Sequence, residues 1–547
     1  MGHGRDGKVY VSCGKEEGRV IKYSLMQIDF DSCRSSRVCE EFPGNGEVVP
    51  GMEKDFLVYD NRELYEYDLA SQTREPVLNW VESGIDTRGE LYFGVLEDGR
   101  IYVATREFQS DEWELAVLSR ATGEEQASKK EEITLGYLYA GLEIQQAVVD
   151  FNKSSDRYRI VLKQYEEYDR LLVDLTVNCP DILDLKGLNV EEYADMGLFE
   201  DLGPYMDNSP LLDRSDYLEN VLEAYTFDGS LVTIPSSFWI RTIFAGAESI
   251  REVFGDDFEG GWTVDELMAY ADANPGKELL DGYSGSGVME CLMLYGKESF
   301  IDWENGTCSF DSDRFRKVLE FAGRFPAESA PVFGCPPARI EAGEVLLGNE
   351  EISRFDGLQV YEEVFGGETV SVGYPTADGS SGCTLRANNA LAISARSPHK
   401  EGAWAFVESF LANEKYEAAN TFNDFVTNKR WLERKAEAAR GEEYATDENG
   451  KTLLDENGKP IRLRYSVLTM SYGNGWSFST HTPTEEEIQR VYALIETAVG
   501  RPDPEKDVIL KIISEETDAF FQGQKTAEAV ADIIQRRVML YMEENRK

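Results

Sequence analysis

Histidine is scarce in this chain of 547 residues, which has only His3, His399 and His481, far apart in the sequence. Such isolation argues against a zinc site and against histidine-based catalysis. The sequence also lacks Gly-x-Ser-x-Gly, His-Glu-x-x-His, a phosphate-binding loop and Gly-x-Gly-x-x-Gly. We therefore predict no catalytic residue, no cofactor and no metal site.

Positive charge and long apolar runs are lacking as well. The 55 basic residues are outnumbered by 102 acidic ones, which gives a formal net charge of −47 and opposes binding to nucleic acid or to an anionic membrane. No run of about 18 apolar residues occurs, so no transmembrane helix is predicted. The eight cysteines form no Cys-x-x-Cys pair, a spacing that permits disulfides without demanding them.

The first part of the chain contains a weak repeat. Residues 20–25, 64–69 and 115–120 look like corresponding strands, 44 and 51 residues apart, close to the period of propeller blades. A closed propeller needs roughly four to eight blades, and residues 1–128 hold three at most. The start at Met1-Gly2-His3 carries no signal peptide, so we expect the sequence to be cut from a longer protein. The alternative is an independent β-rich domain without a repeat.

A βαβαβ pattern begins after a polar linker at 121–132. Strands are predicted at 133–139 and 158–162, with a helix between them that carries Ile144, Val148 and Phe151 on one stripe. A second helix, at 171–177, leads to the stretch 179–185, Cys-Pro-Asp-Ile-Leu-Asp-Leu. This stretch reads as a buried parallel strand ending on a carboxylate at the edge where ligands bind in α/β sheets.

Further pieces follow in a definite order. Residues 189–192 form an Asx capping box, 197–202 read Gly-Leu-Phe-Glu-Asp-Leu, and Thr263 and Glu266 form a second capping box after Trp262. Ala-Ile-Ser at 392–394 precedes Ser-Pro-His-Lys at 397–400, and two helices close the chain, at 508–521 and after Thr526. In this order the pieces resemble the extracellular solute-binding proteins of ABC importers, above all their sugar-binding branch, over residues 132–547.

The resemblance implies a fold and a domain plan. The fold class would be α/β, a two-lobed periplasmic-binding-protein-like (type II) fold preceded by an all-β, partial propeller-like N-terminal region. The β-rich region would span residues 1–128, the first part of lobe 1 residues 129–235, the first part of lobe 2 residues 236–376, and the return to lobe 1 residues 377–425. Residues 426–547 would supply an acidic hairpin insertion and C-terminal helices, mainly to lobe 2.

The resemblance also implies a function. The chain would capture a sugar or oligosaccharide in an interlobe cleft, close by hinge rotation and deliver the ligand to the permease subunits of an ABC importer. It would be a monomer and a bacterial cell-surface lipoprotein, outside the cytoplasm and not an enzyme. The alternatives are a binding protein for a peptide, an amino acid or a polyamine, a carbohydrate-active hydrolase, and a structural interaction protein.

Candidate ligand-binding residues follow from the chemistry of sugars, which offer apolar ring faces and a belt of hydroxyl groups. Aromatic platforms and polar side chains in expected loops or at element ends fit this requirement. The resemblance places Asp184 at the ligand edge of the first lobe and Asp356 and Gln359 at that of the second. The full set is Asp184, Tyr139, Tyr165, Trp239, Trp262, Asp356, Gln359, Arg386 and Trp476.

Each candidate also has a structural alternative. Trp239, Trp262 and Trp476 could be core or surface anchors, and Asp184 could be a helix cap or a solvated carboxylate. Tyr139 and Tyr165 could serve packing alone. The alternative for the remaining candidates, and for the neighbouring Asn388, is a structural polar contact.

Overall fold

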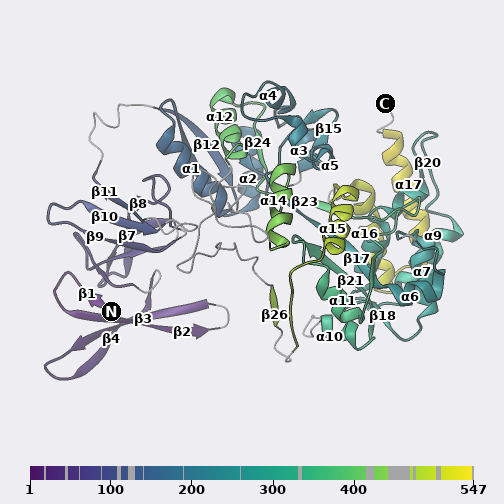
Figure 1. Ribbon diagram of the computed structural model, residues 1–547, viewed down its shortest axis with the longest axis horizontal. Helices are drawn as coiled ribbons and strands as arrows, with labels where there is room; N and C mark the ends of the chain where they lie inside the picture. Colours follow the sequence, from purple (N-terminus) through teal and green to yellow (C-terminus); the bar gives the residue numbers. More distant parts are fainter. Residues whose placement is uncertain are drawn as a thin grey trace. The chain divides into compact units, whose positions relative to one another are not determined.

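The computed structural model describes residues 1–17, 20–43, 47–60, 62–87, 89–106, 113–120, 130–138, 141–188, 190–258, 260–329, 336–413, 424–441, 468–471, 476–500 and 507–544. The chain divides into two compact units (Figure 1). The first unit comprises Met1–Asp184 and Arg396–Ala419, and the second comprises Leu185–Ala395 and Asn420–Lys547. No helix among the described residues is long and apolar enough to span a membrane.

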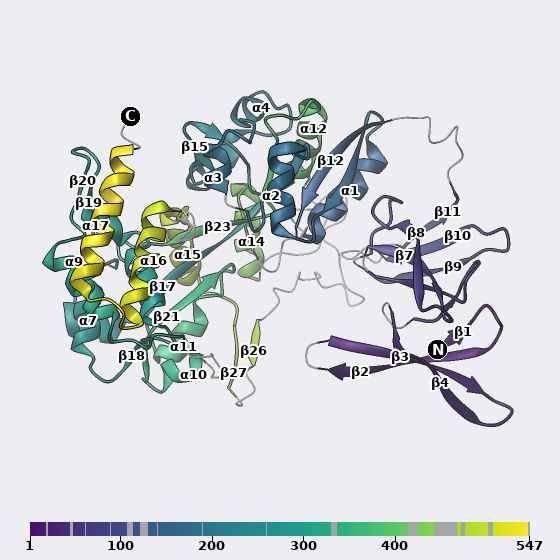
Figure 2. The same cartoon turned by 180° about the vertical axis from the view of Figure 1, so that it is seen from behind.

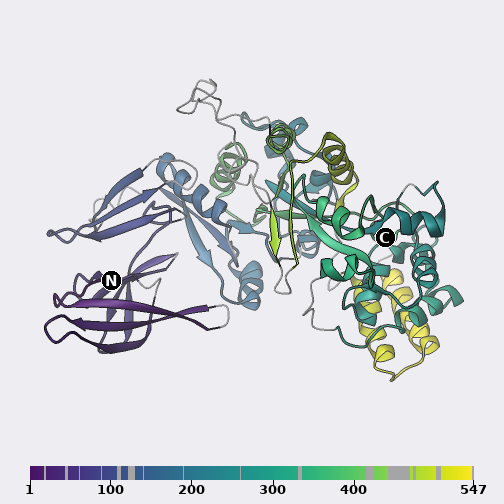
Figure 3. The same ribbon diagram turned by 60° about the horizontal axis from the view of Figure 1, so that its bottom comes forward.

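The N-terminal region is made of three antiparallel sheets, purple to blue in Figure 3. The first contains β1 (Gly2–His3), β2 (Val9–Glu17), β3 (Val20–Asp29) and β4 (Arg34–Phe42) in that order. The second contains β5 (Val49–Pro50), β6 (Phe56–Tyr59), β7 (Glu63–Asp68) and β8 (Thr73–Asn79). The third contains β9 (Leu91–Val95), β10 (Ile101–Arg106) and β11 (Trp113–Leu118).

The repeat seen in the sequence corresponds to a repeat of these sheets. Its three members lie in β3, β7 and β11, and each is the third strand of its sheet. One apolar core joins the first and second sheets through residues such as Leu25 and Phe56, and another joins the second and third through Trp80 and Phe93. The prediction of an all-β region is confirmed at the level of antiparallel sheets, and the propeller stays a prediction.

The first unit also holds the predicted parallel strands. β12 (Glu131–Tyr137) pairs in parallel with β13 (Tyr158–Gln164) on one side and with β14 (Ile182–Asp184) on the other. The connections run through α1 (Leu142–Ser154) and α2 (Tyr168–Val177), so the predicted βαβαβ order is confirmed. α12 (Lys400–Leu411) packs on this sheet at Gly402, where a Cβ atom would lie 2.7 Å from side-chain atoms of Ile133 and Tyr158.

The second unit is built on a mixed sheet around the ten-residue strand β17 (Ser237–Gly246). β17 pairs antiparallel with β21 (Val345–Ile352) and with β23 (Thr384–Asn388). The sheet also includes β18 (Glu278–Leu280), β22 (Thr369–Ser371), β25 (Phe425–Val426) and β28 (Val499–Gly500). Smaller strands are β15 (Thr226–Phe227), β16 (Ser230–Leu231), β19 (Ile301–Asp302), β20 (Thr307–Cys308), β24 (Leu391–Ile393), β26 (Thr469–Ser471) and β27 (Ser477–Ser479).

Helices form two cores in the second unit. The larger core lies among α6 (Ala247–Phe254), α7 (Val264–Ala273), α8 (Gly285–Met293), α9 (Asp313–Ala322), α16 (Val508–Phe521) and α17 (Ala527–Glu544), the last two in yellow in Figure 2. The other involves α11 (Gln359–Phe365), α14 (Lys429–Ala439) and α15 (Glu485–Thr497). Shorter helices are α3 (Val190–Asp195), α4 (Gly203–Asp207), α5 (Glu219–Glu223) and α10 (Pro336–Glu341).

The two α/β units agree with the predicted α/β class. The capping box of Thr263 and Glu266 is present at the start of α7, and the closing helices lie where the sequence predicts them. The short strand β22 pairs with β17. The lobe boundaries at 128, 235, 376 and 425 stay predictions, and the predicted hairpin at 447–459 lies outside the described residues.

Candidate functional site

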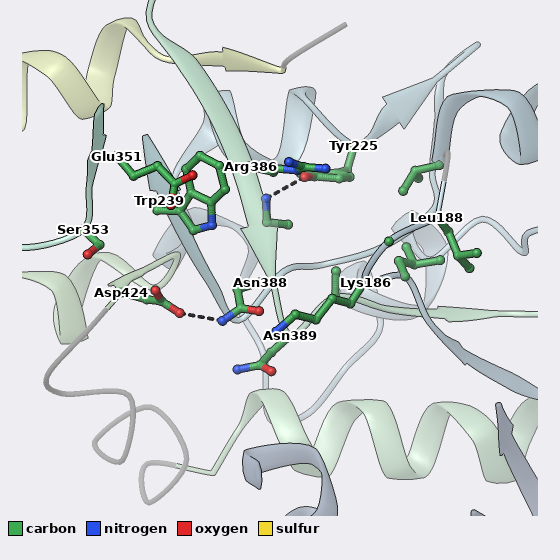
Figure 4. Close-up of a pocket in the computed structure, with 15 residues that line it drawn as sticks. Lys186, Leu188, Tyr225, Trp239, Glu351, Ser353, Arg386, Asn388, Asn389 and Asp424 are labelled. Atoms are coloured by element: carbon green, nitrogen blue, oxygen red, sulfur yellow. Dashed lines mark hydrogen bonds between the residues drawn. The ribbon is translucent and has the colours of Figure 1, made fainter. Parts of the chain in front are cut away.

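A cavity of about 480 Å³ lies in the second unit (Figure 4). Its walls come from β17, β21 and β23 and from the loop that follows β14 in the sequence. The residues that line it include Lys186, Leu188, Tyr225, Trp239, Glu351, Ser353, Arg386, Asn388, Asn389 and Asp424. Two of the predicted ligand-binding residues, Trp239 and Arg386, are among them.

Trp239 and Arg386 form a cross-strand pair. They are directly opposed in the antiparallel register of β17 and β23, and the Arg386 guanidinium lies 5.8 Å from the centre of the indole ring. Side chains alternate along a strand, so Phe238 and Ile240 enter the core while Trp239 faces the cavity. A partly exposed indole with a cation over its ring offers a ligand both an apolar surface and a charged group.

Polar side chains line the wall next to this pair, at the neighbouring position of the same two strands. Asn388 donates from Nδ2 to Oδ2 of Asp424 at 2.7 Å, as the dashed line in Figure 4 marks. The same oxygen accepts a longer hydrogen bond of 3.4 Å from Ser237. The Asp424 carboxylate is therefore held by two donors while it faces the cavity, which orients it for a ligand hydroxyl group.

Asn389 is the most unusual residue of the wall. It is 3% exposed and adopts a left-handed backbone conformation, with φ of +50°, which few residues other than glycine adopt. Its amide Nδ2 has no hydrogen-bond partner among the described residues. A buried donor without a partner costs free energy that a ligand acceptor would recover, so this amide is suited to contact a ligand.

Two further unpartnered hydroxyl groups belong to Ser236, which is hydrogen-bonded to Asn389 through the backbone, and to Thr427, which is bonded in turn to Ser236. The Ser236 amide donates to the Asn389 carbonyl at 3.4 Å, and the Thr427 amide donates to the Ser236 carbonyl at 3.1 Å. Within the described part of the chain, the buried Oγ of Ser236 and Oγ1 of Thr427 have no partner. A polar cluster therefore adjoins the cavity at Asn389.

Tyr225 contributes a neutral hydroxyl group. Burial raises the pKa of Tyr225 to about 12, so the phenol keeps its hydrogen at neutral pH. Its oxygen accepts from the backbone amide of Ala387 at 2.7 Å, which fixes the ring against β23. The phenol hydrogen thus adds a donor to a wall that also supplies acceptors.

The charges of the wall balance. Lys186 and Arg386 are cationic, and Glu351 and Asp424 are anionic, whereas the whole chain is strongly acidic. A wall without net charge favours a polar but neutral ligand over a polycation.

Three predicted residues lie elsewhere in the second unit, in contacts of their own. Trp262 is fully buried in the core and donates from Nε1 to the Gly373 carbonyl at 2.9 Å. Asp356 is also fully buried, where it accepts two hydrogen bonds of 2.8 Å from Arg354. Gln359, 2% exposed, accepts from the amide of His481 at 2.8 Å. None of the three lines the cavity, and their ligand-binding role stays a prediction.

The other predictions meet different outcomes. Tyr165 is buried in the first unit and donates to Asp174 at 3.0 Å, and Asp184 is buried at the end of β14, one residue before the cavity wall begins in the sequence. Trp476 donates to Glu341 at 3.2 Å and does not line the cavity. Tyr139 lies outside the described residues. The ligand-binding role of all these residues stays a prediction.

Sequence reasoning did not select Tyr225, Glu351, Asn389 or Asp424. Asn389 carries a signal in retrospect, because a doubled Asn directly before the apolar strand β24 is a pattern that favours a left-handed residue. No sequence signal marks Asp424 and Glu351, because the chain has 102 acidic residues and nothing local distinguishes the two that line the cavity.

Metal and disulfide chemistry have no site in the part of the chain that the structure describes. No group of three or more His, Cys, Asp or Glu residues there is arranged to hold a metal ion. The described cysteines are free thiols, and burial raises the pKa of Cys291 and of Cys383 to about 12, which keeps both protonated.

Comparison with known proteins identifies one family. A family model described as bacterial extracellular solute-binding protein matches residues 146–430, slightly more than half of the chain. No curated protein sequence matches the chain.

Solved structures similar to this chain include three carbohydrate-binding proteins. One is an ABC substrate-binding protein from Listeria monocytogenes in complex with cycloalternan, with 15% identity, a TM-score of 0.46, and coverage of 76% of this chain and 100% of that chain. The sugar-binding protein MalE from Xanthomonas citri has 15% identity, a TM-score of 0.47 and coverage of 76% and 98%. The cyclic alpha-maltosyl-1,6-maltose binding protein from Arthrobacter globiformis has 17% identity, a TM-score of 0.44 and coverage of 76% and 100%.

Proposed function

Because the chain belongs to the family of bacterial extracellular solute-binding proteins, we propose that the cavity beside Trp239 captures a sugar or short oligosaccharide for an ABC importer. The observation that carries this proposal is the combination of one indole face with several polar groups in a wall without net charge.

Each part of a sugar has a counterpart in the wall. The indole of Trp239 suits the apolar face of a pyranose ring, as aromatic side chains suit apolar ligand surfaces generally. The Asp424 carboxylate and the Asn389 amide supply an acceptor and an unpartnered donor for hydroxyl groups. Arg386 and Tyr225 add donors at the other end of the wall.

The alternatives fit these residues less well. A polyamine needs an excess of carboxylates, whereas Lys186 and Arg386 offset Glu351 and Asp424. A glycosidase needs two carboxylic groups on either side of a scissile bond; the wall does hold two, Glu351 and Asp424, so recovery of the ligand unchanged is the observation that separates binding from turnover. We infer binding without turnover.

The remaining parts of the function belong to the same proposal. Binding would favour a closed form, which docks on the permease subunits of an importer, and the protein would act as a monomeric surface lipoprotein. The three N-terminal sheets would be blades of a propeller, because their repeated third strands follow the spacing of blades.

A thermal-shift screen tests the proposal. The plate contains mono- and oligosaccharides together with amino acids, short peptides and polyamines, and a ligand that binds only the folded protein raises the unfolding midpoint. We expect carbohydrates alone to produce a shift and to be recovered unchanged after incubation. A shift with polyamines or peptides only, or hydrolysis of the bound glycan, would contradict the proposal.

A further inference from the structure

A second cavity, of about 350 Å³, adjoins the first in the same unit. β21, α10, α11 and β26 contribute to its walls. Glu351 and Ser353 line both cavities, so the two spaces meet at the end of β21.

Several polar side chains of the second cavity are held by partners. Asn349 donates to the Tyr283 hydroxyl at 2.9 Å and accepts from Tyr374 at 2.9 Å. Asp281 is paired with Arg339, and Arg354 is held by Asp356.

Apolar side chains cover much of the remaining wall. They include Leu280, Ile340, Leu347, Ile352, Val360 and Leu468. Tyr361 adds a ring that is fixed by stacking on Phe244, with 4.4 Å between ring centres, and Gly348 allows this ring to lie close to β21. The wall is thus apolar and held in place before any ligand enters.

We propose that this second cavity binds an apolar alkyl or aromatic group of the same solute whose sugar lies against Trp239. The preferred ligands would then be glycosides with an apolar aglycone, an amphipathic class, rather than free sugars. The inference rests on the proposed function for the position of the sugar. Its own basis is the shared border at Glu351 and Ser353 and the apolar side chains that line the second cavity.

The first test uses an uncharged apolar dye, N-phenyl-1-naphthylamine, whose fluorescence rises in apolar surroundings. We expect saturable binding to the wild type. Val360→Trp, which fills the cavity, and Leu468→Asp, which places a carboxylate on its wall, should each weaken dye binding about tenfold. Leu468 is 37% exposed and directly precedes β26, so we expect Leu468→Asp to fold normally. This variant keeps the test valid if Val360→Trp does not fold.

Matched controls carry the same substitutions at exposed positions away from both cavities. These are Val173→Trp, where Val173 is 58% exposed, and Leu211→Asp, where Leu211 is 61% exposed. Both should bind the dye like the wild type. Absence of saturable dye binding, or equal binding by the cavity variants and their controls, would overturn the inference.

The second test compares methyl, butyl and hexyl β-D-glucosides and β-D-maltosides by calorimetry. Affinity should rise about three- to fourfold per methylene group buried in the wild type, and should not rise in Val360→Trp or Leu468→Asp. Equal affinity for methyl and hexyl glycosides would overturn the inference while leaving sugar binding in place. If no carbohydrate of the screen binds, the proposed function fails. The dye experiment does not test carbohydrate binding, so a failure of dye binding contradicts only the inference about the second cavity.

Discussion

Trp239 owes its place in the cavity wall to the alternation of β17, which sends its two neighbours into the core. Arg386 follows from the same geometry, because it is the residue opposite Trp239 in the register of β23. The pair therefore depends on strand pairing between segments nearly 150 residues apart in the chain. Either residue can be altered without removing a core side chain.

Replacing Trp239 with Ala should weaken binding of the sugar found in the screen by about tenfold or more, because the indole supplies the apolar platform. Titration calorimetry measures the affinity, and urea unfolding checks the fold. Trp303→Ala, at a tryptophan that is 56% exposed and outside both cavities, is the control and should bind normally. Equal affinity of the two variants would remove Trp239 from the site.

Asn389→Gly separates the amide of Asn389 from its backbone conformation. Glycine adopts a φ of +50° without strain, so the variant should fold as stably as the wild type while losing the unpartnered donor. We expect the affinity for the sugar to fall about three- to tenfold, the value of one neutral hydrogen bond. Asp228→Gly, at an exposed residue with φ of +46°, controls for the backbone change.

Lys435 makes the free energy of unfolding depend on pH. Burial lowers the pKa of Lys435 to about 7, an effect that Asp424 opposes and Arg354 reinforces. Between pH 7 and about 10 the unfolded chain binds a proton that the folded chain lacks, so this group's contribution to stability rises with pH, by up to about 1.4 kcal/mol per unit. Below pH 7 both states are protonated and its contribution no longer changes.

Lys435→Met removes this dependence. Measured by urea unfolding at pH 7, 8 and 9, the wild type should gain stability relative to the variant at each step. Lys429→Met, at an exposed lysine of the same helix α14, is the control. A difference between the wild type and Lys435→Met that stays constant across these pH values would contradict the assignment.

At the scale of elements, helix caps are the features that local sequence predicts best. Thr263 accepts from the Glu266 amide, and Glu266 accepts from the Thr263 amide, at the start of α7. The preceding residue, Trp262, packs in the core that α7 covers. The cap thus positions a helix on which the stability of the second unit depends, away from the cavity.

Thr263→Ala should lower the free energy of unfolding by about 1 kcal/mol, because the Glu266 amide at the helix start loses its acceptor. Thr263→Ser keeps a hydroxyl cap and should recover most of the loss. The affinity for the sugar should be unchanged in both variants, since Thr263 does not line the cavity. An equal loss of stability in the serine variant would show that the methyl group, not the cap, is responsible.

At the scale of the whole molecule, the net charge of −47 is the dominant feature. Repulsion among the carboxylates destabilises the compact state, and salt screens it over a Debye length of about 10 Å at 0.1 M. The thermal midpoint at pH 7 should therefore rise between 20 and 300 mM NaCl. The same salt step near pH 4.4, the isoelectric point of the sequence, should have a much smaller effect. Equal rises at the two pH values would point to a cause other than charge.

The sequence by itself determined what depends on near neighbours. Periodicity located the strands and helices of the βαβαβ segment, the capping box at Thr263 is a four-residue pattern, and the repeat at residues 20, 64 and 115 identified the same strand of three sheets. The order of these local patterns was enough to indicate the family. Each single strand, helix or cap is a pattern of a few neighbouring residues, and residue propensity and spacing determine such local structure directly.

The tertiary structure alone decided which polar and aromatic side chains face the cavity. Trp239 and Arg386 were selected from the sequence, but so was Trp262, which the fold buries, and Asp356, which Arg354 engages. Asp424 and Asn389 were not selected, because nothing near them in the sequence separates a carboxylate or amide in a cavity from one in a turn. Strand register and chain crossing bring such residues together, and these depend on packing across the whole unit rather than on local pattern.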